Sequence, residues 1–156
     1  MMTFDDAFQK LVGHEGGYVD SRGDPGGATK YGISQRSYPN EDIAGLTLER
    51  AKAIYLRDFW LVAKCDAMPE GIRFDVFDMA VNSGVSASIR IVQRAVGVAV
   101  DGVIGPATLQ ALNAASPAKM AANFNGARLA FMAELPTWPS YSRGWARRIA
   151  SNLLSI

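Results

Sequence analysis

Glu15 is the clearest candidate for a catalytic residue in this sequence, because it lies at the end of a predicted helix, directly before Gly16 and Gly17. The negative end of a helix dipole and a neighbouring apolar stripe both disfavour a charged carboxylate, so we expect the pKa of Glu15 to be raised. A carboxylic acid that keeps its proton near neutral pH can serve as a general acid. The two glycines also leave room for a ligand to approach closely. Position alone supports equally well a solvated glutamate beside a glycine cap.

A glycine-rich stretch follows, and it contains candidate partners for that acid, namely Asp20, Asp24 and Thr29. An enzyme that cleaves a glycosidic bond needs a second polar group, which either stabilises positive charge on the sugar or positions water. A hairpin that folds back over the helix end would bring Asp24 or Thr29 to this place. Asp20 competes with Asp24 for the role, and we favour Asp24. Both favoured residues have structural alternatives, since Asp24 begins a strong turn signal and Thr29 is also an ordinary strand residue.

Three further residues are candidates for contact with a sugar: Tyr18, Tyr31 and Asn82. Each tyrosine can stack on a sugar ring or pack beneath the hairpin. The amide of Asn82 can donate and accept hydrogen bonds, which suits acetamido and hydroxyl groups, but a helix C-cap is an equally good interpretation. Trp138 and Trp145 are more typical of core residues than of a binding platform.

We predict no metal site and no cofactor. His14 is the only histidine of the chain, and one histidine does not make a zinc site. Residues 20–24 lack the ligand spacing of a calcium loop. Cys65 is the only cysteine, lies in no recognisable nucleophile motif, and is interpreted as a packed small hydrophobe.

The elements that must position these residues are mainly helical, with one small β-hairpin after the first helix. Apolar residues recur at helical spacing after caps at Thr3 and Thr47, and Gly84 is expected to end a central helix. Pro136 and Pro139 are expected to form a rigid elbow before the last helix. The predicted helices cover residues 3–15, 48–55, 69–83, 86–96, 106–113, 117–134 and 141–154.

Composition bounds the class of protein. A chain of 156 residues suits one compact domain, which needs no disulfide or metal to fold. Its formal net charge of +1 does not favour a dedicated nucleic-acid binder. No stretch approaches the roughly 20 apolar residues of a membrane span. The first residues lack the basic and apolar regions of a secretory signal. We therefore expect a monomer that makes no stable membrane insertion.

Several longer motifs carry a family resemblance. They are Glu-Gly-Gly-Tyr at 15–18, Asp-Pro-Gly-Gly-Ala-Thr-Lys-Tyr-Gly-Ile-Ser at 24–34, and Phe-Asp-Met-Ala-Val-Asn-Ser-Gly at 77–84. With them the chain resembles glycoside hydrolase family 108, bacterial and phage N-acetylmuramidases with a lysozyme-like fold. The motifs at 93–97 and 101–108 resemble the peptidoglycan-binding segment commonly attached in this family, and the motif at 144–148 also agrees. The resemblance implies that Glu15 is the catalytic acid.

A more distant similarity to phage-type lysozymes, which carry a glutamate, an aspartate and a threonine at similar spacing, implies supporting roles for Asp24 and Thr29. The resemblance implies a catalytic region at 1–92 and a helical peptidoglycan-binding segment at 93–156, packed into the same fold. The reaction it implies is hydrolysis of the β-1,4 bond between N-acetylmuramic acid and N-acetylglucosamine, by an endolysin that accumulates in the host cytoplasm and reaches the wall after release. A lytic transglycosylase acting on the same bond and a non-catalytic wall-binding module remain alternatives.

Overall fold

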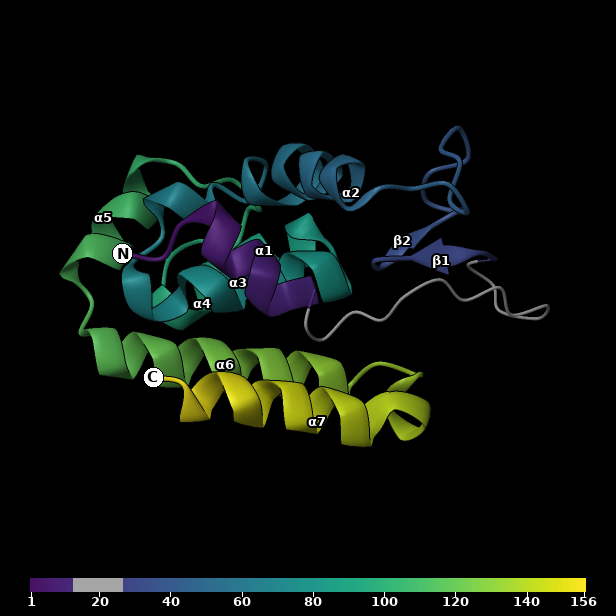
Figure 1. Cartoon of the computed structure of the whole chain (residues 1–156). Helices are drawn as coiled ribbons and strands as arrows, with labels where there is room; N and C mark the ends of the chain where they lie inside the picture. The colour runs from purple at the N-terminus through teal and green to yellow at the C-terminus, as the bar shows by residue number, and fades with distance from the viewer. Residues whose placement is uncertain (13–26) are drawn as a thin grey trace. The chain divides into compact units, whose positions relative to one another are not determined.

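The computed structural model describes residues 1–12 and 27–156, and these form a mainly helical chain with one small hairpin (Figure 1). The prediction of a mainly α fold with a hairpin after the first helix is confirmed. The described residues form two compact units: an N-terminal unit of residues 2–59, and a helical unit of residues 60–156 together with Met1. The candidates His14, Glu15, Tyr18, Asp20 and Asp24 lie outside the described residues.

The N-terminal unit begins with α1 (Phe4–Val12). Thr3 caps this helix as predicted, because its Oγ1 accepts a hydrogen bond from the Asp6 N–H at 3.2 Å. Asp6 reciprocates, since its carboxylate accepts from the Thr3 N–H at 2.9 Å. The hydrogen bonds that the Thr3 N–H and the Thr3 hydroxyl donate to this carboxylate lower the pKa of Asp6. The apolar stripe of α1 is buried through Ala7, Phe8 and Leu11. The helix is therefore held by its cap and by one packed face.

The rest of the N-terminal unit comprises a two-stranded antiparallel hairpin, β1 (Thr29–Lys30) and β2 (Ile33–Ser34), followed by α2 (Leu48–Tyr55). Thr47 caps α2 as predicted, accepting a hydrogen bond from the Arg50 N–H at 3.1 Å. A π-helical turn, Leu56–Trp60, continues α2 and was not predicted. Such turns have no periodicity that distinguishes them from an ordinary α-helix in sequence.

The helical unit is built around α3 (Glu70–Ser83), which is buried on all sides over most of its length. Figure 1 shows α6 and α7 running side by side in opposite directions. The other elements are the 3-10 turn Cys65–Ala67, α4 (Val85–Val96), α5 (Pro106–Ala114), α6 (Pro117–Ala133) and α7 (Trp138–Leu154). The predicted helices of this unit are thus all present, with small differences at their ends.

Two of those differences follow from proline. Pro69 lies at the cap position rather than in the first turn, so α3 begins one residue later. Pro139 is accommodated in the first turn of α7, where no backbone donor is needed, so α7 begins at Trp138 instead of Tyr141. The prediction of an elbow that includes Pro139 is therefore wrong.

A buried polar network joins α3, α6 and α7. The carboxylate of Asp78, 1% exposed, accepts from Arg128 Nη1 at 2.8 Å and from Arg148 Nε at 2.7 Å. Asn152 Nδ2 donates to the same carboxylate at 3.3 Å. One turn earlier on α3, Asp75 accepts from Asn125 Nδ2 at 2.8 Å. A hydrophobic pattern cannot indicate such a network, because its members lie 50 to 74 positions apart in the sequence.

Candidate functional site

Thr29 is the one proposed catalytic residue that the structure describes, and it lies half-buried in β1, paired with Ser34 of β2. Its Oγ1 donates to the Gly27 carbonyl at 3.4 Å, a long hydrogen bond within the approach to the strand. The hydroxyl oxygen keeps acceptor capacity for a water or a sugar hydroxyl. Its placement agrees with the prediction of a strand residue and leaves the catalytic role a prediction.

The hairpin turns at Tyr31 and Gly32, and both have positive φ angles, 51° and 78°. Positive φ at both central residues is typical of the type I′ turn that suits a two-residue hairpin. Gly32 adopts this conformation freely, but Tyr31 does so at a cost, and backbone strain of this kind gathers at functional sites. The Tyr31 ring is half-buried, with the Lys30 ammonium 5.5 Å from its centre. Because the ring is partly open, stacking on a sugar remains a prediction.

Tyr55 holds that turn in place, and sequence reasoning placed it only in the apolar stripe of α2. Its fully buried side chain donates from the hydroxyl to the Tyr31 carbonyl at 2.6 Å. Its ring centre lies 5.6 Å from that of Phe8 in α1. One side chain therefore ties the hairpin tip to the helix that leads towards Glu15. The sequence offered one indication of this contact, because the hydroxyl of a tyrosine in a buried helix face needs a hydrogen-bond partner.

Asn82 lies in the last turn of α3, and the C-cap of that helix is Gly84, with φ 97°. The interpretation of Asn82 as a C-cap is therefore wrong. Its Nδ2 is buried, and no described residue accepts a hydrogen bond from it. A buried amide donor without an acceptor costs about 1–3 kcal/mol, which makes it a candidate for a ligand contact.

The pKa of Cys65 and the arrangement of possible metal ligands bear on which reactions the described residues could perform. Burial raises the pKa of the Cys65 thiol to about 12, so this cysteine stays protonated at neutral pH and is not an activated nucleophile. Among residues 1–12 and 27–156, no three His, Cys, Asp or Glu side chains come together as metal ligands. No helix within those ranges has the length and apolar character that crossing a membrane requires.

The motif predicted to resemble a wall-binding segment forms a hydrogen-bonded clamp around Gln93, which is 1% exposed. Gln93 Nε2 lies 2.8 Å from Asp101 Oδ1, 3.0 Å from the Val103 carbonyl and 3.3 Å from Thr108 Oγ1. Its Oε1 accepts from the Gly102 N–H at 2.9 Å. The polar groups of this motif therefore bind one another and fix the loop before α5. Glutamine, aspartate and threonine at this spacing have a structural role here.

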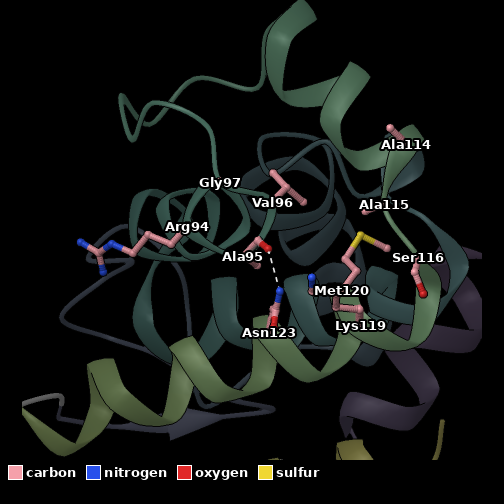
Figure 2. A pocket seen from close by; sticks show the side chains of 10 residues that line it. All are labelled: Arg94, Ala95, Val96, Gly97, Ala114, Ala115, Ser116, Lys119, Met120 and Asn123. Atoms are coloured by element: carbon pink, nitrogen blue, oxygen red, sulfur yellow. Dashed lines mark hydrogen bonds between the residues drawn. The ribbon is translucent and has the colours of Figure 1, made fainter.

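A pocket of about 510 Å³ lies in the helical unit where α4, α5 and α6 meet (Figure 2). The Asn123 amide crosses it and donates to the Ala95 carbonyl at the end of α4, at 3.2 Å. Arg94 and Lys119 are its charged lining residues. In Figure 2 the guanidinium of Arg94 points away from the labelled residues of α6. The pocket holds none of the predicted site residues.

Comparison with known proteins gives two family matches. Residues 8–84 match the model described as glycosyl hydrolase 108, and residues 87–150 match one described as a predicted peptidoglycan domain. Among solved structures, the chain is similar to one titled "Structure of Brucella abortus SagA", with a TM-score of 0.89 and 31% sequence identity, covering 97% of this chain and 92% of that one. No curated protein sequence matches this chain.

Proposed function

The chain belongs to glycosyl hydrolase family 108, and from this premise we propose that it is an N-acetylmuramidase with Glu15 as its general acid. It is a glycoside hydrolase with an attached peptidoglycan-binding domain. The observation that carries the proposal is the family match at 8–84, because every predicted site residue falls inside it. These residues are Glu15, Tyr18, Asp24, Thr29, Tyr31 and Asn82.

In the proposed mechanism, Glu15 donates its proton to the oxygen of the β-1,4 bond between N-acetylmuramic acid and N-acetylglucosamine. Asp24 and Thr29 hold the attacking water or stabilise the positive charge that develops on the sugar. The acceptor capacity left on the Thr29 hydroxyl supports this role. Asn82 donates an Nδ2 hydrogen, for which the described residues provide no acceptor, to the substrate. Tyr18 and Tyr31 stack on sugar rings. The distance between the two carboxylates decides whether the configuration at the sugar is retained or inverted.

Replacing Glu15 with glutamine tests the central assignment. Glutamine is nearly the same shape but cannot donate the proton, so we expect release of reducing ends from purified peptidoglycan to fall by about 10²–10⁴-fold. The far-ultraviolet circular dichroism and the unfolding midpoint should stay near those of the native chain. Glu49→Gln is the matched control, since Glu49 is exposed in the first turn of α2 in the same unit. Equal activity of Glu15→Gln and Glu49→Gln would remove Glu15 from the mechanism.

Product mass tests the reaction class. A hydrolase adds water to the new sugar end, whereas a lytic transglycosylase leaves a 1,6-anhydro end. Mass spectrometry of soluble products from purified peptidoglycan separates the two, and we expect the hydrated product. The same assay with Asp24→Asn and Asp20→Asn distinguishes the two candidate partners of Glu15. Only replacement of the true partner should slow the reaction strongly.

We further propose a bacteriolytic, endolysin-like role, in which the protein stays in the cytoplasm until the membrane is opened. The reaction proposed for it supports this, because breaking the glycan strands removes the restraint on turgor. Expression in bacteria should leave the culture density unchanged until a pore-forming agent is added, and lysis should then follow. Expression of the Glu15→Gln chain should give no such lysis. Lysis by the native chain without the pore-forming agent would contradict the proposed location.

A further inference from the structure

Three aromatic side chains form a row on the first half of α7: Trp138, Tyr141 and Trp145. Their spacing of three and then four residues places them on one face of the helix. The rings of Tyr141 and Trp145 are stacked, with centres 5.4 Å apart and planes 20° apart, and the Trp138 ring lies 6.1 Å from Trp145. Tyr141 is 56% exposed, while both tryptophans are half-buried. The row thus has one open ring, Tyr141, stacked on a half-buried tryptophan, and the interpretation of the two tryptophans as core residues stays a prediction.

The second half of this helix face is buried within the helical unit. Further along the same face of α7, Ile149 and Asn152 are 3% and 4% exposed, and Asn152 bonds to Asp78 of α3. The aromatic row continues this face towards the start of α7, where the tryptophans are half-buried and Tyr141 is open to solvent. Large aromatic side chains contribute most when they are covered, so an exposed tyrosine ring between two partly open tryptophans marks a contact surface.

The register of the helices brings Asn82 to the same end of the helical unit. Asp75 contacts Asn125 and Asp78 contacts Arg128, so α3 and α6 run in the same direction. α7 runs back along α6 and meets Asp78 through Arg148 (Figure 1). One turn beyond Asp78 on α3 is Asn82, and about one turn before Arg148 on α7 is Trp145. The Nδ2 of Asn82, which is buried and has no acceptor among the described residues, therefore lies at the level of the aromatic row.

The charge of α7 indicates which kind of polymer this surface would bind. The last helix, Trp138–Leu154, contains three arginines and no acidic residue. Arg143 and Arg147 are exposed, and no described carboxylate forms an ion pair with either one. Their spacing places them on the faces of α7 turned away from the aromatic row, so they attract a polyanion at long range rather than contact it beside the rings.

We propose that the aromatic row, with Asn82 at its level, binds the glycan strand of peptidoglycan. The flat faces of the rings pack against the C–H faces of the amino sugars, and the Asn82 amide donates to an acetamido oxygen. The carboxylates that peptidoglycan carries on its lactyl groups and peptides complement the positive charge of α7. The proposal rests on peptidoglycan being the substrate, and it assigns part of its recognition to a helix within the matched domain at 87–150.

Binding is measured first with purified, insoluble peptidoglycan and the full-length Glu15→Gln chain, by co-sedimentation. Added to that chain, Tyr141→Ala and Trp138→Ala should each weaken binding about tenfold, as expected for truncation of an aromatic anchor. Tyr141→Phe should bind like the unaltered chain, because the ring and not the hydroxyl makes the contact. Leu154→Ala is the matched control, an exposed side chain at the other end of the same helix, 88% exposed. Unchanged binding of both alanine variants would overturn the proposal.

A second measurement uses soluble chitohexaose, a neutral β-1,4 oligomer of N-acetylglucosamine, and tryptophan fluorescence. The chain has three tryptophans, and Trp60 is 1% exposed, so a change in emission reports mainly on Trp138 and Trp145. A saturable blue shift that is lost in Tyr141→Ala supports the stacking contact. The proposal would be overturned if chitohexaose caused no shift of emission in the chain with the native aromatic row. It would also be overturned if Tyr141→Ala lost self-association while its affinity for peptidoglycan stayed unchanged. Release of reducing ends by the Glu15→Gln chain would contradict the proposed mechanism alone and leave the binding result standing.

Discussion

The two units of this chain are stabilised in different ways. In the N-terminal unit the described polar contacts between distant residues include the Tyr55 hydroxyl with the Tyr31 carbonyl, 24 positions apart, and an exposed ion pair of Lys52 with Asp5 at 2.8 Å. In the helical unit, buried charges join helices 50 to 74 positions apart. The hairpin of the N-terminal unit has two residues in each strand and a tyrosine at positive φ. The helical unit is a packed bundle around α3.

This difference agrees with a proposal that the hairpin of the N-terminal unit takes part in catalysis and the helical unit in binding peptidoglycan. A proposed catalytic residue, Thr29, lies on a short hairpin whose geometry depends on a few specific contacts. The matched peptidoglycan domain at 87–150 lies in the regular helices α4 to α7. We therefore expect substitutions of the buried charged residues of the helical unit to change mainly the free energy of unfolding, and substitutions around the hairpin to change mainly the rate of the reaction.

The largest effect on stability is expected for Asp78→Asn. This change removes the negative charge next to Arg128, which is fully buried, and leaves that guanidinium without a counter-ion. Breaking a buried ion pair by removing one partner costs about 3–5 kcal/mol, so the free energy of unfolding in urea should fall by about that amount. Asp66→Asn, at an exposed carboxylate of the same unit, should change it by less than about 0.5 kcal/mol.

A double substitution sharpens this result. Asp78→Leu with Arg128→Met replaces this ion pair with apolar side chains and removes both fully buried charges together, while Arg148, the other cation at Asp78, has a side chain that is 18% exposed and reaches solvent. Such replacements are often neutral or stabilising, so the double variant should recover most of the stability that Asp78→Asn loses. Equal stability of Asp78→Asn and the native chain would show that the helical unit does not depend on its buried charges, and the contrast between the units would fail.

Tyr55→Phe should lower the stability less than Asp78→Asn does, but it should also lower the activity. The ring stays packed against Phe8, and only the hydrogen bond to the Tyr31 carbonyl is lost, which costs about 1 kcal/mol. Because that bond fixes the hairpin turn, kcat should fall by about tenfold while KM changes less. Steady-state kinetics on soluble peptidoglycan fragments measures both.

Tyr38→Phe is the matched control for this change. It also removes a tyrosine hydroxyl in the N-terminal unit, one that donates to Asp58 at 2.9 Å, and it leaves the Tyr31 turn untouched. A similar stability loss with native kcat is expected. If Tyr55→Phe kept native kcat as well, the hairpin would not need this contact for the reaction.

Sequence reasoning predicted the helical unit well because its helices have strong signals. Caps, prolines and apolar spacing located α3 to α7 to within about three residues. In the N-terminal unit the caps Thr3 and Thr47 were equally clear, and the hairpin was expected between 18 and 34. Its turn at Tyr31 was not, because a tyrosine at positive φ is stabilised by a contact with Tyr55 that no local pattern contains.

The same limit applies to the candidate site. Residue type and spacing located Asn82, but only the structure shows that it lies inside α3 and that its buried Nδ2 has no acceptor in the part of the chain that is described. Conversely, the motif around Gln93 was interpreted through its resemblance to a binding segment, and its polar groups bind one another. Which polar atoms of a motif remain free depends on neighbours that are distant in sequence, so sequence identifies candidates better than roles.

The smallest effect concerns Asp101, an exposed carboxylate that nonetheless has a long-range partner. The hydrogen bond from Gln93 Nε2, followed by that from the Val103 N–H, lowers the pKa of Asp101 below its ordinary value. A carboxyl whose folded-state pKa is lowered stabilises the fold fully above its unfolded pKa, about 4, and loses that contribution as the pH falls through the folded value. The free energy of unfolding should therefore decline below about pH 4.

Urea unfolding at about pH 7, 5, 4 and 3 measures this decline, and Asp101→Asn isolates the contribution of one group. The variant should be less stable than the native chain near neutral pH, and the gap between them should narrow as the pH falls below about 4, because asparagine does not titrate. A gap that stays constant down to about pH 3 would mean that the Gln93 clamp does not depend on the charge of Asp101. Since the clamp fixes the loop before α5, that result would leave the hydrogen bonds of Gln93 with Val103, Thr108 and Gly102 to hold this loop, and the contrast between the units would then rest on Asp78 alone.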